Sequence, residues 1–332
     1  MKSNPTLLSG LSRAMFCTFA LALNLFAISS NAQTNWPTKP VTLVVPFATG
    51  GTTDILARAI GQKLGENLKQ PVIIENKAGA GGTLAAGVVA KTPADGYTLL
   101  MSTIAHTMAP NLYKSLNYDF EKDFDPIGMV ATTPNVLIVN NNLPVKTVAE
   151  LITFIKAHPG EVNYGSAGSG STEHLAGELF AMMTGVKIAH VPYKGGAPMM
   201  TDLMGGQIQM AIETSPSAHP QVVAGKVRAL GVTTMEKSPA YPGIPTLNES
   251  GIKGYDFITW FALMAPHGTP ASIQAKLTKE LGVVLSDLNI VKNFDEQGVT
   301  PGGVKPAQMS AFIKNETQKW AKVVQESGAK VE

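Results

Sequence analysis

The sequence contains a single cysteine among its 332 residues, Cys17, and this residue lies in an N-terminal segment with the features of an export signal. If that segment is removed, the mature chain has no internal disulfide, no thiol nucleophile and no cysteine ligand for a metal. The lack of disulfides does not argue against export, because a chain of about 300 residues can bury a stable core without them.

Net charge and long apolar runs are also lacking. The chain has 26 Lys and Arg residues and 24 Asp and Glu residues. Two of the basic residues, Lys2 and Arg13, lie in the N-terminal segment. The rest of the chain is therefore formally neutral, which excludes the basic surface that nucleic acids or anionic membranes require. No later stretch is as long and apolar as a membrane-spanning helix, which needs roughly 18 residues.

Residues 1–32 are predicted to form a cleavable signal peptide. Positions 14–28 are mostly apolar but too few to span a bilayer, and positions 30–32 supply the small residues that a signal peptidase reads. This places cleavage before Gln33. A lipoprotein is disfavoured, because the bulky Phe16 precedes Cys17. The mature protein is therefore expected in the periplasm.

Enzyme signatures are absent from the sequence. It contains no G-x-S-x-G nucleophile elbow, no G-x-x-x-x-G-K-S/T phosphate loop, no G-x-G-x-x-G fingerprint and no H-E-x-x-H zinc motif. The nearest approach to a metal site is the pair His174 and Glu178, four residues apart on one helix face, and such pairs are common on solvated helices. We expect no catalytic residue, no metal and no cofactor, with a periplasmic hydrolase or lyase as the rival hypothesis.

Strand and helix patterns alternate along the chain and predict an α/β fold. The first elements are expected to be strands at 41–45, 71–75 and 98–101, with helices at 54–68 and 83–91 between them. A break at 140–144 precedes a second run of alternating elements, which includes a short helix expected at 221–224. A strand at 260–265 then leads back to two closing helices, expected at 271–285 and 306–327. The sequence therefore predicts two domains, 33–138 plus 256–332 and 139–255, joined by two crossing segments that form a hinge.

Three glycine-rich loops, at 46–54, 78–83 and 165–172, are each placed to open a helix. Glycine lets the backbone approach a ligand closely, and the first turn of a helix offers unpaired N–H groups with a partial positive charge. One such loop is an ordinary tight turn. Three at like positions favour a pocket that holds an anion without a metal or a cationic side chain.

Other residues at predicted strand ends are candidates for the same pocket. Tyr193 and Lys194 precede a fourth glycine turn, and Thr103 and Glu213 each follow a strand. Because a glutamate facing a carboxylate ligand would repel it, Glu213 indicates either a cationic group on the ligand or a position away from direct contact.

Taken in order, six short motifs make the chain similar to a known family. They are VPFATGGTTD at 45–54, ENKAGAGG at 75–82, DGYTLL at 95–100, YGSAG at 164–168, VPYKG at 191–195 and GKVRAL at 225–230. The chain resembles the Bug-type (Bordetella uptake) receptors, the extracytoplasmic solute-binding proteins of tripartite tricarboxylate transporters. The resemblance covers essentially the whole mature chain.

The resemblance implies a two-domain periplasmic-binding-protein fold of type II-like flytrap form, which closes on its solute and performs no catalysis. It implies that backbone N–H groups of the first two loops hold a ligand carboxylate, and that the third loop contributes from the second domain. Together with the strand-end residues, the predicted ligand-binding set is Phe47, Ala48, Thr49, Gly50, Gly51, Thr52, Gly79, Ala80, Gly81, Gly82, Thr103, Ser166, Ala167, Gly168, Ser171, His174, Tyr193, Lys194 and Glu213.

One position departs from the family pattern, since these receptors usually carry aspartate where this chain has Glu213. The extra methylene is expected to reshape the distal end of the pocket, so the ligand of a particular relative does not transfer directly. Aliphatic dicarboxylates, tricarboxylates, aromatic acids and acidic amino acids all stay open.

The predicted function is that of a monomeric periplasmic receptor that captures a small organic carboxylate for the membrane subunits of a tripartite tricarboxylate transporter. The alternative is a ligand-binding sensor or adaptor that presents its closed form to a signalling partner. In both cases a ligand that touches both domains would shift the protein toward its closed form.

Overall fold

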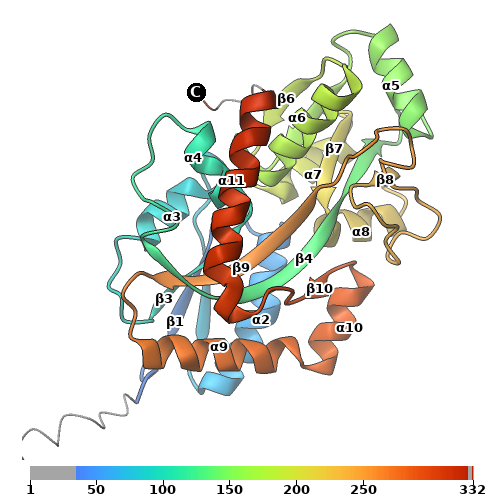
Figure 1. Cartoon of the computed structure of the whole chain (residues 1–332). Coiled ribbons are helices and arrows are strands. Elements are labelled where there is room, and N and C mark those ends of the chain that lie inside the picture. The colour runs from blue at the N-terminus through green and yellow to red at the C-terminus, as the bar shows by residue number, and fades with distance from the viewer. Residues whose placement is uncertain (1–34, 328–330, 332) are drawn as a thin grey trace, which may run out of the picture. The chain divides into compact units, whose positions relative to one another are not determined.

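The structure is a computed structural model that describes residues 35–327 and 331. The chain divides into Met1–Thr38 and Lys39–Glu332, and the fold described below is that of the second unit (Figure 1). The predicted signal peptide, residues 1–32, lies outside the described residues.

A single mixed sheet runs through this unit, with the strand order β2-β1-β3-β9-β4-β7-β5-β6. Its strands are β1 (Val41–Val45), β2 (Val72–Asn76), β3 (Thr98–Thr103), β4 (Phe124–Asn140), β5 (Asn163–Ser166), β6 (Ala189–Pro192), β7 (Met210–Thr214), β8 (Val227–Val232), β9 (Ile258–Pro266) and β10 (Thr300–Pro301). β1 pairs in parallel with β2 and β3, whereas β9 lies antiparallel between β3 and β4. The prediction of an α/β fold is therefore confirmed.

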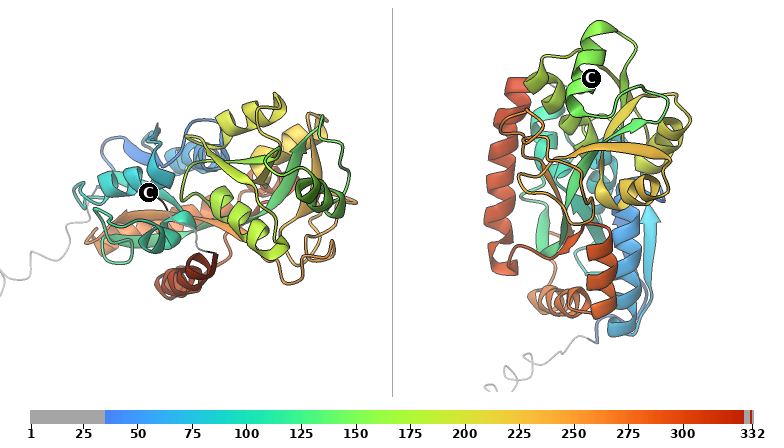
Figure 2. Two further views of the ribbon diagram at one scale, coloured as in Figure 1. Left: turned by 90° about the horizontal axis from the view of Figure 1, so that it is seen from above. Right: turned by 90° about the vertical axis from the view of Figure 1, so that its right-hand side faces the viewer.

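Helices cover both faces of this sheet (Figure 2). They are α2 (Thr52–Leu68), α3 (Thr83–Val89), α4 (Ala105–Leu112), α5 (Val148–Ala157), α6 (Thr172–Thr184), α7 (Gly196–Met204), α8 (Ser215–Val223), α9 (Ala271–Leu285), α10 (Leu288–Glu296) and α11 (Met309–Ser327), with short 3-10 turns at Ala80–Gly82 and Pro306–Gln308. α2 packs on α9, while α11 contacts α4, β4 and α6 and so runs along the sheet (Figure 1).

The long strand β4 joins two halves of the sheet. Its first part pairs with β9 and β10, and its last part pairs with β7 and β8. We call β1–β3, β9 and β10 with the first part of β4 the first half, and β5–β8 with the rest of β4 the second half. The domain boundaries at 138/139 and 255/256 stay a prediction.

Side chains of β4 alternate between two cores, as the period of a strand requires. Val136 and Ile138 pack in a cluster with residues of α7 and α8, whereas Leu137 and Val139 belong to the larger cluster that includes α6 and α11. Each successive residue is thus buried on the opposite face, which explains why this segment reads as a continuous apolar run.

Three features of the helices differ from the sequence prediction. Three helices, not two, follow the return strand β9, because α10 was not predicted. A helix was expected at 221–224, but α8 begins earlier, at Ser215, with Pro216 in its first turn, where a missing N–H costs nothing. The short helix α4 was not predicted, because Pro110 inside it reads as a helix breaker.

Asn135 lies on β4 where the strand passes from the first half to the second, and its side chain is completely buried. Its Nδ2 donates to the Ile212 carbonyl at 3.3 Å, and its Oδ1 accepts from the Thr259 hydroxyl at 2.7 Å. Its backbone N–H donates to Thr233 Oγ1 at 2.9 Å. One amide side chain therefore links strands of both halves.

Replacing Asn135 with alanine is expected to lower the free energy of unfolding by about 2 kcal/mol, because the Thr259 hydroxyl and the Ile212 carbonyl then lose partners inside the protein. Urea unfolding followed by circular dichroism measures the change. Asn141→Ala is the control, since this amide bonds the Gly225 carbonyl at an exposed position and should cost less than about 1 kcal/mol. Equal losses in both variants would contradict the linking role of Asn135.

Candidate ligand site

Four helices begin at one cavity. They are α2, α6, α7 and α8, whose N-cap residues are Gly51, Ser171, Gly195 and Thr214. The cavity is lined by Phe47, Gly51, Thr52, Thr53, Thr103, Ala167, Thr172, Glu173, Gly196, Glu213, Thr214, Thr259 and Phe261. All four helices directly follow strands of the sheet, as in other α/β proteins that bind ligands at the carboxyl ends of strands.

The partial positive charges around this cavity come from the backbone. No Lys, Arg or His is among the described residues that line it. Each helix N-terminus instead carries a partial positive charge and N–H groups that have no partner within the helix. The cavity is therefore suited to an anionic group, as the sequence predicts for its glycine-rich loops.

The first loop is held by Asp54, in the first turn of α2. Its carboxylate accepts hydrogen bonds from the Gly50 N–H at 2.9 Å, from Arg58 Nε at 2.9 Å and from Asn76 Nδ2 at 3.0 Å. Burial raises the pKa of Asp54, but these hydrogen bonds outweigh it and leave the pKa below its ordinary value. Asn76 also donates to the Phe47 carbonyl, so the loop is fixed at both ends.

The second loop takes an unusual backbone path. Gly79, Ala80, Gly81 and Gly82 all have positive φ, at 150°, 47°, 59° and 99°. The turn is closed by the Gly82 N–H, which donates to the Gly79 carbonyl at 3.0 Å, and by the Thr83 hydroxyl, which donates to the Ala80 carbonyl at 2.8 Å. Glycine is required at most of these positions because a side chain disfavours positive φ.

The third loop rests on two stacked histidines. The rings of His174 and His190 lie 4.1 Å apart, Gly170 N–H donates to His174 Nδ1 at 3.1 Å, and Ser166 Oγ lies 2.6 Å from His190 Nε2. Burial lowers the pKa of His174, which the charge of Glu178 partly opposes, and burial lowers the pKa of His190 to about 3. Both rings are therefore neutral at neutral pH and serve to position the loop.

Loops from the two halves touch across the cavity. The Ala48 N–H donates to the Lys194 carbonyl at 3.0 Å, and the Tyr113 hydroxyl donates to the Ser169 carbonyl at 2.7 Å. Thr52 Oγ1 lies 2.7 Å from Thr214 Oγ1. The cavity that remains is about 20 Å³, room for about one water molecule. This is a closed arrangement, and a larger ligand needs the halves to move apart.

Two buried carboxyl groups face this cavity, Glu173 on α6 and Glu213 at the end of β7, with exposed fractions of 7% and 1%. Oε1 of Glu213 accepts from the Thr214 N–H at 2.9 Å, whereas Oε2 of each glutamate has no hydrogen-bond partner. Burial, and then the charge of Glu173, raise the pKa of Glu213 to about 8; burial also raises the pKa of Glu173.

The structure brings only part of the predicted site to the cavity wall. Phe47, Gly51, Thr52, Thr103, Ala167 and Glu213 line it. The other predicted residues lie in or near the surrounding loops without lining it: Ala48, Thr49, Gly50, Gly79, Ala80, Gly81, Gly82, Ser166, Gly168, Ser171, His174, Tyr193 and Lys194. Of these, Lys194 is exposed and contributes its carbonyl, while the Tyr193 hydroxyl donates to Asp202.

Sequence reasoning missed several residues of the cavity wall, among them Glu173, Thr259 and Phe261. Glu173 directly follows the third glycine-rich loop, in the first turn of α6, where an acidic residue is common and does not by itself indicate a buried site. Thr259 and Phe261 lie on β9, far along the chain, and only the return of that strand beside β3 and β4 brings them here.

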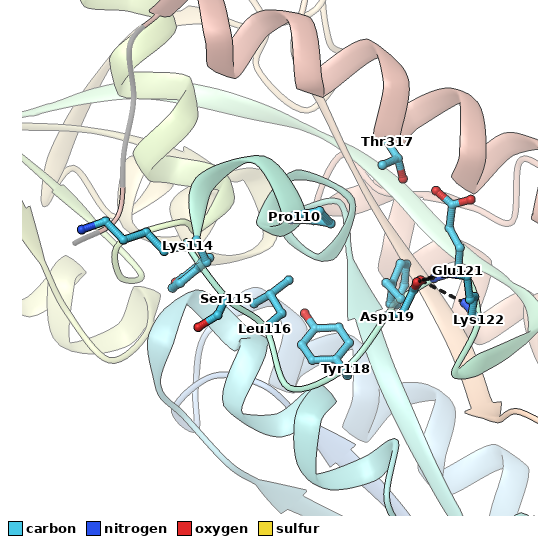
Figure 3. A pocket seen from close by; sticks show the side chains of 11 residues that line it. Pro110, Lys114, Ser115, Leu116, Tyr118, Asp119, Glu121, Lys122 and Thr317 are labelled. Atoms are coloured by element: carbon cyan, nitrogen blue, oxygen red, sulfur yellow. Dashed lines mark hydrogen bonds and ion pairs between the residues drawn. The ribbon is translucent and has the colours of Figure 1, made fainter.

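A larger cavity, about 640 Å³, lies elsewhere, between the segment that follows α4 and Thr317 of α11 (Figure 3). Its wall comes mostly from residues 113–122, and its charged groups include the ion pair of Lys122 with Asp119, which is exposed (Figure 3). No helix begins among its lining residues, in contrast to the smaller cavity.

In the part of the chain that the structure describes, no three or more His, Cys, Asp or Glu side chains gather as a metal site would require. Within the same residues, no helix is both long and apolar enough to cross a bilayer.

Comparison with known proteins identifies the family. Residues 56–329 match the family model of the tripartite tricarboxylate transporter family receptor, TctC. The chain is 39% identical over 298 residues to the protein BugT of Bordetella pertussis, covering 89% of this chain and 91% of that protein. It is 33% identical over 315 residues to a UPF0065 protein from the tcbD-tcbE intergenic region of Pseudomonas sp. (strain P51), covering 95% and 94%.

Solved structures agree with this assignment. Rpa4515 of R. palustris with adipate is 42% identical with a TM-score of 0.86, and covers 89% of this chain and 100% of its own. The periplasmic binding protein BugD is 34% identical with a TM-score of 0.87, covering 90% and 100%. MatC of Rhodopseudomonas palustris with bound malate is 33% identical with a TM-score of 0.84, covering 87% and 100%. The chain therefore has the fold of periplasmic binding proteins and belongs to the TctC family of tripartite tricarboxylate transporter receptors.

Proposed function

We propose that this protein is a periplasmic receptor that binds a small dicarboxylate between the two halves of its sheet. The observation that carries the proposal is the meeting of four helix N-termini at one buried cavity without a cationic side chain on its described wall. The relatives solved with adipate and with malate support a dicarboxylate rather than another anion.

Ligand capture requires the halves to separate and close again. The closed arrangement leaves about 20 Å³, far less than a small-molecule site of roughly 300 Å³. An open form would expose the loops of both halves to solvent, and a ligand that contacts both would favour closure. The hinge is expected where the chain crosses between the domains 33–138 plus 256–332 and 139–255.

Different groups around the cavity are proposed to bind the carboxylates and the carbon chain of the ligand. In this proposal, N–H groups at the starts of α2 and α6 hold carboxylate oxygens, and the Thr103 hydroxyl supplies a further donor. Phe47 and Phe261 supply apolar surface for the carbon chain of the ligand. The protein binds and releases its ligand unchanged, and no residue is assigned a catalytic role.

After export and cleavage before Gln33, the closed monomer would dock on the membrane subunits of a tripartite tricarboxylate transporter. The family description favours transport over signalling, because it names transporter receptors. The family resemblance also favours a binding protein over a hydrolase or lyase.

A thermal-shift screen of the mature chain tests the proposal. Adipate, malate, glutarate, citrate, benzoate and aspartate are each titrated against ligand-free protein. We expect a concentration-dependent rise in melting temperature with a dicarboxylate, corresponding to about 2.7 kcal/mol of stabilisation at 100 times the dissociation constant. A response to citrate or benzoate but to no dicarboxylate would contradict dicarboxylate binding, and so would the lack of any response.

A further inference from the structure

We propose that Glu173 and Glu213 form a proton-holding pair at the inner end of the ligand cavity, and that closure on a dicarboxylate takes up a proton onto this pair. The inference rests on the proposed function and concerns how the same site recognises its ligand. The protonated carboxyl would donate a hydrogen bond to the distal carboxylate of the ligand.

The geometry of the two side chains carries this inference. Both are at least nine-tenths buried and both line the cavity. Each has one carboxyl oxygen, Oε2, without a hydrogen-bond partner. A buried polar atom without a partner is costly, so these two oxygens mark a place where a ligand group or a proton completes the structure.

The donors around Glu213 satisfy only one of its oxygens. Oε1 receives the Thr214 N–H at 2.9 Å and lies 2.7 Å from the Thr214 hydroxyl. Oε2 faces Gly196, at the start of α7, since a Cβ built on that glycine would lie 3.0 Å from it. A proton on Oε2 would turn it from an unpaired acceptor into a donor that points toward the cavity.

Charged groups on the neighbouring elements do not neutralise the pair. The negative charge of Glu173, on α6, raises the pKa of Glu213. The charge of Glu213 in turn raises the pKa of Tyr241. On α2, Asp54 is already bound by Arg58. Lys194, which precedes α7, is exposed.

Charge balance then decides the protonation state in the complex. Two ionised glutamates and a dicarboxylate in one enclosed cavity would place four negative charges together, opposed mainly by helix N-termini. Taking a proton from water onto a carboxyl removes one of these charges and supplies a donor at the same time. The raised pKa of Glu213 supports this direction.

Isothermal titration of the tightest-binding dicarboxylate, from about pH 6 to about pH 9.5, tests the inference. Affinity for the wild-type protein is expected to fall about tenfold per pH unit once the pH exceeds the pKa of the ligand-free pair. At one pH within that range, titrations in buffers of different ionisation enthalpy should report proton uptake of up to about one per ligand.

Glu213→Gln is the informative variant, because its amide is nearly isosteric with a protonated carboxyl and also donates a hydrogen bond. It should bind the same dicarboxylate with affinity that varies less than about threefold over the pH range. Glu161→Gln makes the same chemical change at an exposed position of the second half and should keep the wild-type slope. Circular dichroism confirms that both variants are folded.

The possible outcomes separate the two proposals. If no dicarboxylate binds the wild-type protein at any pH, the proposed function fails and the inference falls with it. If a dicarboxylate binds with affinity independent of pH, the proposed function stands and the proton-holding pair is overturned. If aspartate binds more tightly than succinate and gains affinity as the pH rises, the two glutamates are ionised and bind the ammonium group of aspartate. This result would also overturn the proton-holding pair.

Discussion

Replacing Gly81 with alanine is expected to lower affinity for the ligand by about a hundredfold or more. A Cβ on Gly81 would lie 2.4 Å from the Ser169 carbonyl oxygen and 2.9 Å from the Tyr113 hydroxyl in the closed arrangement. Both distances are too short for a carbon atom, and because Ser169 belongs to the second half, the loops of the two halves could no longer meet. Since capture depends on closure, the variant would bind only through the weaker contacts of the open form.

The matched control is Gly185→Ala. Gly185 has φ of 66° and ψ of 24°, close to the 59° and 20° of Gly81, but a Cβ there meets nothing within 4 Å. Both variants therefore carry a similar backbone strain, about 1 kcal/mol, and only one blocks closure. Isothermal titration gives the affinities and thermal melts give the stabilities. Wild-type affinity in Gly81→Ala would show that closure does not bring these loops together.

The second large effect concerns stability and pH. In the ligand-free wild-type protein, the free energy of unfolding should fall as the pH rises from about 5 to about 9, and Glu213→Gln should lose about 3 kcal/mol less over that range. The pKa of Glu213 is about 8 in the folded protein, against an ordinary value of 4.5. Between these values the folded state keeps a proton that the unfolded state has released, so stability declines with pH.

The full shift in the pKa of Glu213 would change the free energy of unfolding by at most roughly 5 kcal/mol. Opening of the cavity rehydrates the carboxyl and so reduces this change. Below about pH 4.5 both states are protonated, and the stabilising contribution is fully present. Urea unfolding at a series of pH values measures the decline. Because the pKa of Glu173 is also raised, some slope should persist in the variant. A decline of the same size in both proteins would assign the titration to another group.

Local chemistry explains why much of this fold could be predicted. Apolar runs next to glycine turns located β1 and β3, and the helix predicted at 271–285 matches α9 at both ends. The first and third glycine-rich loops were placed correctly at the starts of α2 and α6, since in each case a glycine turn directly follows the end of a strand.

The composition of the cavity wall could be predicted less well, because it depends on contacts between distant segments. Thr259 and Phe261 reach the cavity only because β9 lies between β3 and β4. Glu173 has no local pattern that distinguishes it from an ordinary acidic residue in the first turn of a helix, where such residues are favourable on the surface as well. Its burial beside Glu213 is a property of the assembled halves.

The continuity of β4 also has a consequence for engineering the protein as a biosensor. A reporter domain inserted near Asn135 would cut the strand shared by both halves of the sheet and separate residues that are paired on each side. Turn tips such as those at Gly160 and Gly225 have open space around them and do not interrupt a strand. A fluorescent reporter would therefore be tolerated at these tips, which lie on the second half, and would leave the shared strand intact.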